Sequence, residues 1–133
     1  EVDRFAVPRY FSVAGLSRVD DGVVAYLMPR GDDSGAPRTV ALRHLGEHRT
    51  VAVEIPDSRN FEGHGLVWVD GRLLVGGPNA LHEIDPVRAV YVGAHSPQCA
   101  HAKISWIQRV SGALLVHCRS DYLSFEDEVV ALR

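Results

Sequence analysis

Short apolar runs alternate with turn residues along the whole chain, and no long stretch keeps a helical period. Runs rich in Val, Leu, Ile and Tyr between Gly, Pro, Asn and Asp are typical of short strands, so the pattern predicts a mainly β protein. Tight hairpins are expected at Asp20-Asp21-Gly22, Asp70-Gly71 and Ser111-Gly112, because each tip has a residue that tolerates positive φ. Two helical alternatives are residues 37–45, ending at Gly46, and a C-terminal turn capped by Ser124.

The segments that follow the three turns align with one another. GVVAYLMP, GRLLVGGP and GALLVHCR each begin with Gly, continue with mostly apolar residues and end in a break, and VALR occurs at 40–43 and again at 130–133. These echoes predict three repeat units of four strands each. The expected strands are 12–20, 22–29, 38–45 and 49–55; 64–70, 72–77, 80–85 and 88–93; and 103–110, 113–119 and 128–133. The third unit lacks a fourth strand, which residues 2–10 are available to supply.

Residues 65–86, GLVWVDGRLLVGGPNALHEIDP, resemble the repeat of β-propeller proteins, in which a hairpin with Asp-Gly at its tip precedes a strand ending in Asp-Pro. The resemblance implies one all-β domain over 1–133, with β-propeller-like units at about 11–56, 61–94 and 101–133 and with 2–10 closing the last unit. Propellers usually have at least about four blades, so three blades imply a fragment, an assembly of chains or an unusually small ring. The β-trefoil, or another small β-barrel or sandwich, is the alternative.

Composition and charge exclude some classes of partner. The chain has 133 residues, 46% of them apolar and 23% charged, which is ordinary for one globular domain. The net charge is -3 and the basic residues are not clustered, so no nucleic-acid partner is expected. The longest apolar run, Val23 to Met28, is far shorter than the roughly 20 residues needed to cross a bilayer. No membrane partner is expected, and we expect a cytoplasmic location, with secretion after removal of a signal peptide as the alternative.

Histidine and cysteine are the obvious candidates for a metal site. The densest group is His95, Cys99, His101, His117 and Cys118, whose spacing does not match the tight Cys-x2-Cys pairs of zinc sites. If Ser111-Gly112 is a two-residue turn, Val110 pairs with Ala113, which places Trp106 opposite His117 and Ser105 opposite Cys118. Cys99 lies outside that register, so the sequence leaves open whether the two cysteines are free or joined.

His64 and His101 each precede the first strand of a unit. In the propellers that the sequence resembles, this point lies near the central axis, so these histidines are the candidate ligands of a single transition metal. That site belongs to the alternative function, a metal-dependent enzyme or a fragment of a larger propeller enzyme.

No catalytic motif is present: Gly-x-Ser-x-Gly, Gly-x4-Gly-Lys and His-Glu-x2-His are all missing. The expected function is therefore a non-enzymatic binding module without a cofactor, which recognises a protein partner or a carbohydrate through inter-strand loops. A homo-oligomer, or assembly with other propeller parts, is also expected. The candidate binding residues are the loop carboxylates and possible exposed aromatics: Asp32, Asp33, Trp68, Trp106 and Tyr122.

Overall fold

The computed structural model describes residues 16–20, 22–28, 37–58, 65–99, 102–120 and 127–132. Within these ranges the chain forms eleven strands and no helix, which confirms the all-β prediction. The helical alternative at 37–45 is wrong, because residues 39–44 pair as a strand on both sides. Ser124 lies outside the described residues. No helix within the described ranges is long and apolar enough to span a membrane.

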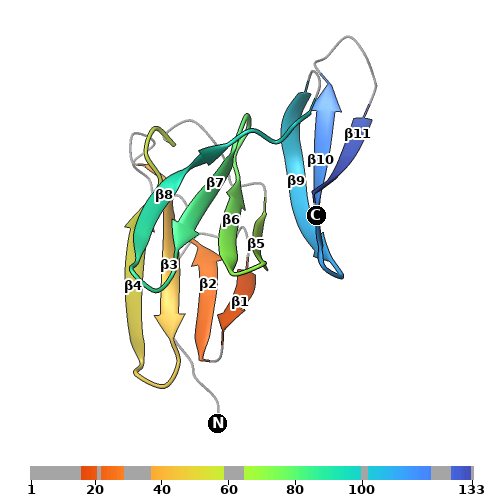
Figure 1. Ribbon diagram of the computed structural model, residues 1–133. Helices are drawn as coiled ribbons and strands as arrows, with labels where there is room; N and C mark the ends of the chain where they lie inside the picture. Colours follow the sequence, from red (N-terminus) through yellow and green to blue (C-terminus); the bar gives the residue numbers. More distant parts are fainter. Residues whose placement is uncertain are drawn as a thin grey trace.

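The strands form three separate antiparallel sheets, each following chain order (Figure 1). The first sheet has β1 (Leu16–Asp20), β2 (Val23–Leu27), β3 (Thr39–His44) and β4 (Arg49–Glu54). The middle sheet has β5 (Leu66–Val69), β6 (Arg72–Gly76), β7 (Leu81–Asp85) and β8 (Val90–His95). The last sheet has β9 (Ala102–Val110), β10 (Ala113–Ser120) and β11 (Asp127–Leu132). Where the ends can be compared, they differ from the predicted ends by at most two residues.

The predicted turns hold the hairpins in register. Asp70 and Gly71 have φ angles of 50° and 72°, and they join the directly paired residues Val69 and Arg72. Two successive positive φ angles match the twist of the flanking strands, which is why Asp-Gly suits this position. Ser111, with φ of 53°, similarly joins Val110 to Ala113.

One part of the predicted register is wrong. Trp106 lies opposite His117 as expected, but Cys118 pairs with Ile104 instead of Ser105. A β-bulge at this point leaves Ser105 as the extra residue in β9, and its hydroxyl bonds His117 Nδ1 and also donates to the His117 carbonyl at 3.3 Å. A bulge adds one residue to one strand without changing the hydrophobic pattern of the other, so alternation alone does not reveal it.

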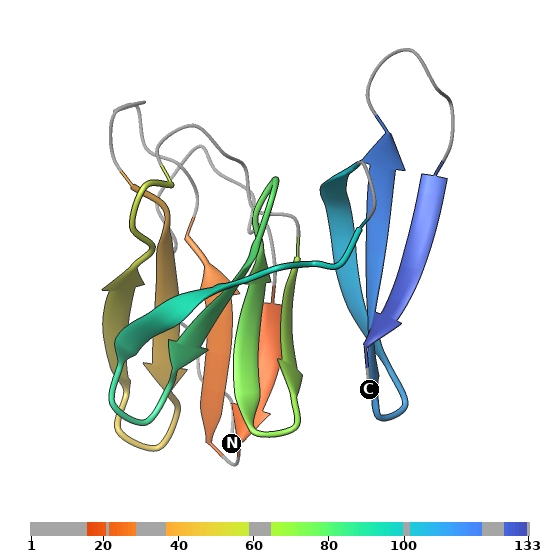
Figure 2. The ribbon, with the colours of Figure 1, turned by 45° about the horizontal axis from the view of Figure 1, so that its top comes forward.

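The middle sheet is buried on both faces, and this arrangement creates two cores (Figure 2). We call the face that a sheet turns toward the next sheet along the chain its forward face, and the opposite one its rear face. In the last sheet, the forward face is the one turned away from the middle sheet. The forward face of the first sheet packs on the rear face of the middle sheet, and the forward face of the middle sheet packs on the last sheet. Continuous burial explains why residues 66–69 and 73–76 read as unbroken apolar runs.

The first strands of successive sheets meet: β1 contacts β5, and β5 contacts β9. Hydrogen-bonded pairing does not join one sheet to another within the described strands, and no closed barrel is formed there. The barrel alternatives predicted from the sequence require such pairing.

A disulfide joins Cys99, just before β9, to Cys118 on β10, with the Cα atoms 6.3 Å apart. Cys118 is fully buried in the second core, and Cys99 packs against that core. The bond therefore ties the connection between the middle and last sheets to the centre of the last sheet.

Candidate functional site

A cavity of about 620 Å³ is lined by the segment after β4, the turn between β6 and β7, and strands β7 and β8. Both the first and the middle sheet thus contribute to it. Its lining residues are Pro56, Asp57, Pro78, Asn79, Ala80, His82, Tyr91 and Ala94. We call it the His82 cavity. Its size lies within the range of roughly 300–1,000 Å³ that is usual for small-ligand sites.

A pair of side chains from adjacent strands forms the polar centre of this cavity. His82 Nδ1 and the Tyr91 hydroxyl are 2.9 Å apart and share a hydrogen bond, and their rings are tilted with centroids 5.9 Å apart. His82 lies on β7 and Tyr91 on β8, so the sheet backbone holds both rings in place.

The turn that carries Pro78 and Asn79 is also fixed by hydrogen bonds. The Gly77 N–H donates to the Ala80 carbonyl at 2.9 Å, and the Ile104 N–H donates to the Pro78 carbonyl at 2.8 Å. The second bond anchors the turn to β9 of the last sheet. Ligand groups therefore meet a wall whose shape is set before binding, which lowers the ordering cost of binding.

Burial determines the charge state of the cavity. It lowers the pKa of the His82 imidazole below its ordinary value, so the ring is neutral at pH 7. Burial also raises the pKa of the Tyr91 hydroxyl, and the negative charge of Asp57 raises it further. At neutral pH the cavity thus presents a neutral hydrogen-bonded pair beside one carboxylate.

Other polar groups in the cavity remain available to a ligand. The side chains of Asp57 and Asn79 are exposed, and neither makes a hydrogen bond within the described part of the chain. Asp57 follows β4 with φ of 54°, a conformation that Asp adopts more readily than most residues. A carboxylate, an amide, a hydroxyl and an imidazole therefore converge on one space.

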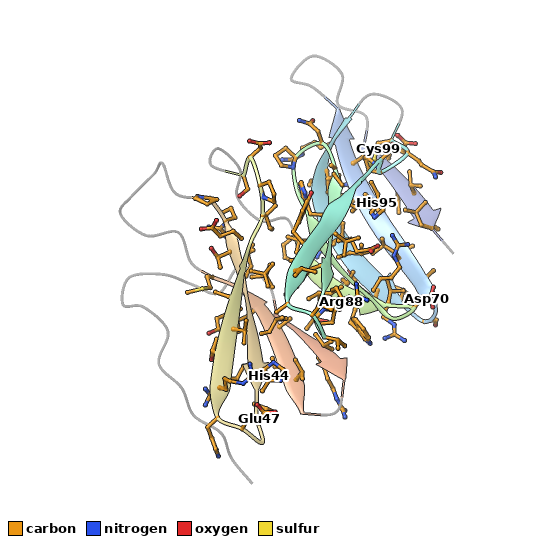
Figure 3. The ribbon with its side chains drawn as sticks, turned by 60° about the vertical axis from the view of Figure 1, so that its left-hand side comes forward. His44, Glu47, Asp70, Arg88, His95 and Cys99 are labelled. Carbon is orange, nitrogen blue, oxygen red and sulfur yellow. A yellow bond between two sulfur atoms is a disulfide. The ribbon has the colours of Figure 1, made fainter. Side chains whose placement is uncertain are left out.

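A second cavity, of about 500 Å³, lies between the middle and last sheets. Figure 3 labels two of its polar lining residues, Asp70 at the β5–β6 turn and His95 on β8. Two of the polar lining residues already pair with the neighbouring Glu83, whose Oε1 bonds Arg72 Nε at 2.5 Å and lies 3.2 Å from His95 Nε2. Because these two side chains are engaged, we regard the His82 cavity as the better candidate.

The tryptophans predicted for binding lie on different faces. Trp68 is partly buried against the first core. Its backbone N–H donates to Ser17 Oγ at 3.1 Å, and its backbone carbonyl accepts from Arg109 Nη1 at 3.3 Å. Trp106 is 47% exposed on the forward face of the last sheet. The structure does not bring the two rings into one site.

The other predicted site residues lie outside the described residues: Asp32, Asp33, His64, His101 and Tyr122. The metal site at His64 and His101 therefore stays a prediction. Within the ranges that are described, no three His, Cys, Asp or Glu side chains are grouped closely enough to hold a metal ion.

Little in the sequence points to the His82 cavity. His82 is one of seven histidines and Tyr91 is one of four tyrosines in the chain, and no motif singles out either residue. Asp57 comes from a different sheet, so only the packing of two sheets brings it near Tyr91. The clearest local signal was the Gly-Gly-Pro-Asn break at 76–79, which marks the turn but not its neighbours.

No protein-family model and no curated protein sequence matches the chain at a significant level. Any functional assignment therefore rests on the geometry of the chain itself.

Proposed function

We propose that this protein is a non-enzymatic binding module that holds a carbohydrate in the His82 cavity. The observation that carries this proposal is the hydrogen-bonded pair of His82 and Tyr91 beside the exposed groups of Asp57 and Asn79. Sugar hydroxyls both donate and accept hydrogen bonds, so a carboxylate, an amide and a hydroxyl complement them. The tyrosine ring and the two prolines offer an apolar surface to the C–H faces of a sugar ring.

The charge of the cavity favours a neutral or cationic ligand over an anion. Asp57 is the formally charged residue among those that line it, and His82 is neutral at pH 7. A phosphate or carboxylate placed there would be repelled by Asp57 without a compensating cation in the lining. We therefore expect a sugar without acidic groups.

We also propose that the three sheets are blade-like repeat units of a propeller-type arrangement, with units at about 11–56, 61–94 and 101–133. Three features support this: consecutive strands form each sheet, sheets pack forward face to rear face, and the first strands of successive sheets meet. The loop-lined cavity then lies between two units, where binding sites on a rigid scaffold are commonly formed.

The disulfide affects the expected location. Disulfides form and persist in oxidising compartments and are rare in the cytosol. The Cys99–Cys118 bond therefore leads us to propose an oxidising compartment in place of the cytoplasmic location expected from the sequence. Thiol titration of protein isolated without reductant is expected to detect no free thiol before reduction and both after it.

Binding to an array of neutral and acidic glycans, followed by calorimetric titration with the best neutral sugar, tests the proposal. Tyr91→Phe and Asp57→Asn are expected to weaken binding by about tenfold or more, since the first removes the hydroxyl and the second replaces a charged acceptor with a neutral amide. Trp106→Phe, far from the cavity, is the control and should leave affinity unchanged. The proposal fails if no neutral sugar binds, or if the Trp106 variant loses binding while the two cavity variants keep it.

A further inference from the structure

The His82 cavity carries a negative charge that its own lining does not balance. Asp57 is exposed, and among the described residues that line the cavity none is Lys or Arg. Burial raises the pKa of the Tyr91 hydroxyl, and the negative charge of Asp57 raises it further, so this charge acts within the cavity. A field that disfavours a second negative charge at Tyr91 favours a positive charge in the same place.

The lining is also rich in hydrogen-bond acceptors. The Asp57 carboxylate and the Asn79 amide oxygen both accept hydrogen bonds. The Tyr91 hydroxyl is bonded to His82 Nδ1 at 2.9 Å, and its oxygen keeps at least one lone pair whichever of the two groups donates. An ammonium group has three N–H donors and no acceptor, so it matches this set of oxygens. The face of the Tyr91 ring adds a further attraction for a cation.

The segment that carries Asp57 is held in place by buried hydrogen bonds. The hydroxyl of the fully buried Ser58 donates to the Ile55 carbonyl at 2.5 Å and accepts from the Arg38 backbone N–H at 2.6 Å. The Ile55 N–H also donates to the Arg38 carbonyl at 2.8 Å. The backbone around Asp57 is therefore ordered before a ligand arrives, which lowers the cost of binding.

We propose that the carbohydrate held in the His82 cavity is an amino sugar with a free primary amine, whose ammonium group pairs with Asp57. This inference rests on the proposed function, because it specifies the kind of sugar that the module recognises. An N-acetylated sugar with the same ring has a neutral amide at this position. Asp57 therefore favours the free amine over the acetylated form.

A bare metal ion is a poorer match for the same charge. Calcium takes about six to eight oxygen ligands, and magnesium needs near-ideal octahedral geometry. The described lining contains a single carboxylate, and no three His, Cys, Asp or Glu side chains in the described ranges are grouped closely enough to hold a metal ion. An amino sugar also uses the apolar surface of Pro56 and Pro78, which a metal ion does not.

Three sugars with the same kind of ring separate the effect of the charge from that of the ring. Glucosamine has an amine that is mostly protonated at pH 7, N-acetylglucosamine has a neutral amide in its place, and glucose has a hydroxyl. Nuclear magnetic resonance titration of the full chain at pH 7, with its disulfide intact, measures each affinity. Glucosamine is expected to bind about fivefold more tightly than either neutral sugar, the gain from one partly exposed ion pair. Butylamine, which has the charge without the ring, should bind more weakly than glucosamine.

Asp57→Asn is the variant that tests the contact. Asn also tolerates the φ of 54° at this position, so the backbone keeps its shape. The ratio of the affinities for glucosamine and glucose should fall close to one. Glu54→Gln is the matched control, because Glu54 is an exposed carboxylate at the end of β4 that does not line the cavity. It should keep the wild-type ratio.

A salt series needs no variant. The preference of the wild type for glucosamine should shrink as the ionic strength rises from about 0.01 M to about 1 M, because the Debye length falls from about 30 Å to about 3 Å. A preference that does not change over this series does not come from charge and overturns the inference.

Failure of the amino-sugar inference can be told apart from failure of the proposed function. Equal affinities of the wild type for the three sugars overturn the inference and leave carbohydrate binding standing. A preference that survives in Asp57→Asn, or that is lost equally in Glu54→Gln, overturns it as well. So does butylamine that binds as tightly as glucosamine. If none of the sugars binds, both proposals fail.

Discussion

The imidazole of His82 lies directly against Gly77. A Cβ atom at position 77 would be 2.7 Å from His82 Nε2 and 2.9 Å from His82 Cδ2. A Cβ atom does not come this close to a neighbouring heavy atom unless that neighbour shifts. The absence of a side chain at Gly77 therefore lets the His82 ring occupy its place beside Tyr91.

Gly77→Ala is expected to displace the His82 ring and disturb its bond to Tyr91. The closest atoms belong to the end of the His82 side chain, which can move aside, so the expected loss of unfolding free energy is that of its hydrogen bond, about 1 kcal/mol. Chemical denaturation measures this loss, and nuclear magnetic resonance of the His82 ring reports its displacement.

The matched control is Gly93→Ala on β8 of the same sheet, where a Cβ would meet no atom within 4 Å. That variant should change stability by less than about 0.5 kcal/mol. Equal losses in the two variants would mean that contact with His82 is not the cause.

Gly65→Ala is expected to loosen the packing between the middle and last sheets. Gly65 has φ of 104°, and a Cβ there would be 2.8 Å from the Ile107 carbonyl oxygen. Backbone strain and overlap with a neighbouring strand act together, so we expect a loss of about 2 kcal/mol or more by urea denaturation. Gly71→Ala separates the two effects, because Gly71 has φ of 72° but open space around it. Its loss should be smaller, about 1 kcal/mol.

Stability is expected to depend on pH through His82. Its pKa is lowered in the folded chain, so the unfolded chain takes up a proton at higher pH than the folded chain does. The contribution of His82 to the free energy of unfolding is complete above its ordinary pKa of about 6.5. This contribution is lost as the pH falls from there through the folded-state pKa. Urea denaturation from pH 8 to pH 5 should show the decline. His82→Asn, which keeps a polar atom near the Tyr91 hydroxyl, should make the curve flatter, and an unchanged slope would contradict the assignment.

Tyr91 is expected to lower the stability of the fold at high pH, whereas His82 lowers it at low pH. Folding raises the pKa of the Tyr91 hydroxyl. The contribution of Tyr91 to the free energy of unfolding is therefore complete below the ordinary pKa of about 10 and is lost as the pH rises through the folded-state pKa. Denaturation between pH 9 and pH 11 should therefore show falling stability in the wild type. Tyr91→Phe removes the titrating hydroxyl and should reduce that fall; a decline that persists in full would have another cause.

Reduction of the disulfide is expected to destabilise the last sheet. Cys99 and Cys118 are 19 residues apart, and closing a loop of this length contributes about 3 kcal/mol. The melting temperature of the wild type should drop on addition of reductant, whereas Cys99→Ser should melt low with or without reductant. A wild type that melts at the same temperature in both conditions would show that the bond does not contribute.

Strand positions were predictable from the sequence because local rules determine them. Apolar runs broken by Asp70-Gly71 or Ser111-Gly112 leave the chain few alternatives to a hairpin, and the observed strands follow those breaks. The bulge at Ser105 was not predictable, since it depends on how β9 and β10 settle against the second core. The disulfide was not predictable from the sequence either, because Cys99 meets Cys118 only after the chain crosses from the middle to the last sheet.

The candidate site was much harder to predict than the fold. The sequence by itself determined the all-β class, the three groups of consecutive strands and the turns, because hydrophobic alternation and residues with positive φ act over a few neighbours. Only the tertiary structure decided which groups share a cavity, since Asp57 comes from one sheet, and His82 and Tyr91 come from another. Tertiary structure alone also decided which apolar face stays exposed: the same pattern of residues is buried in the first two sheets and open at Trp106, because burial depends on whether another sheet packs there.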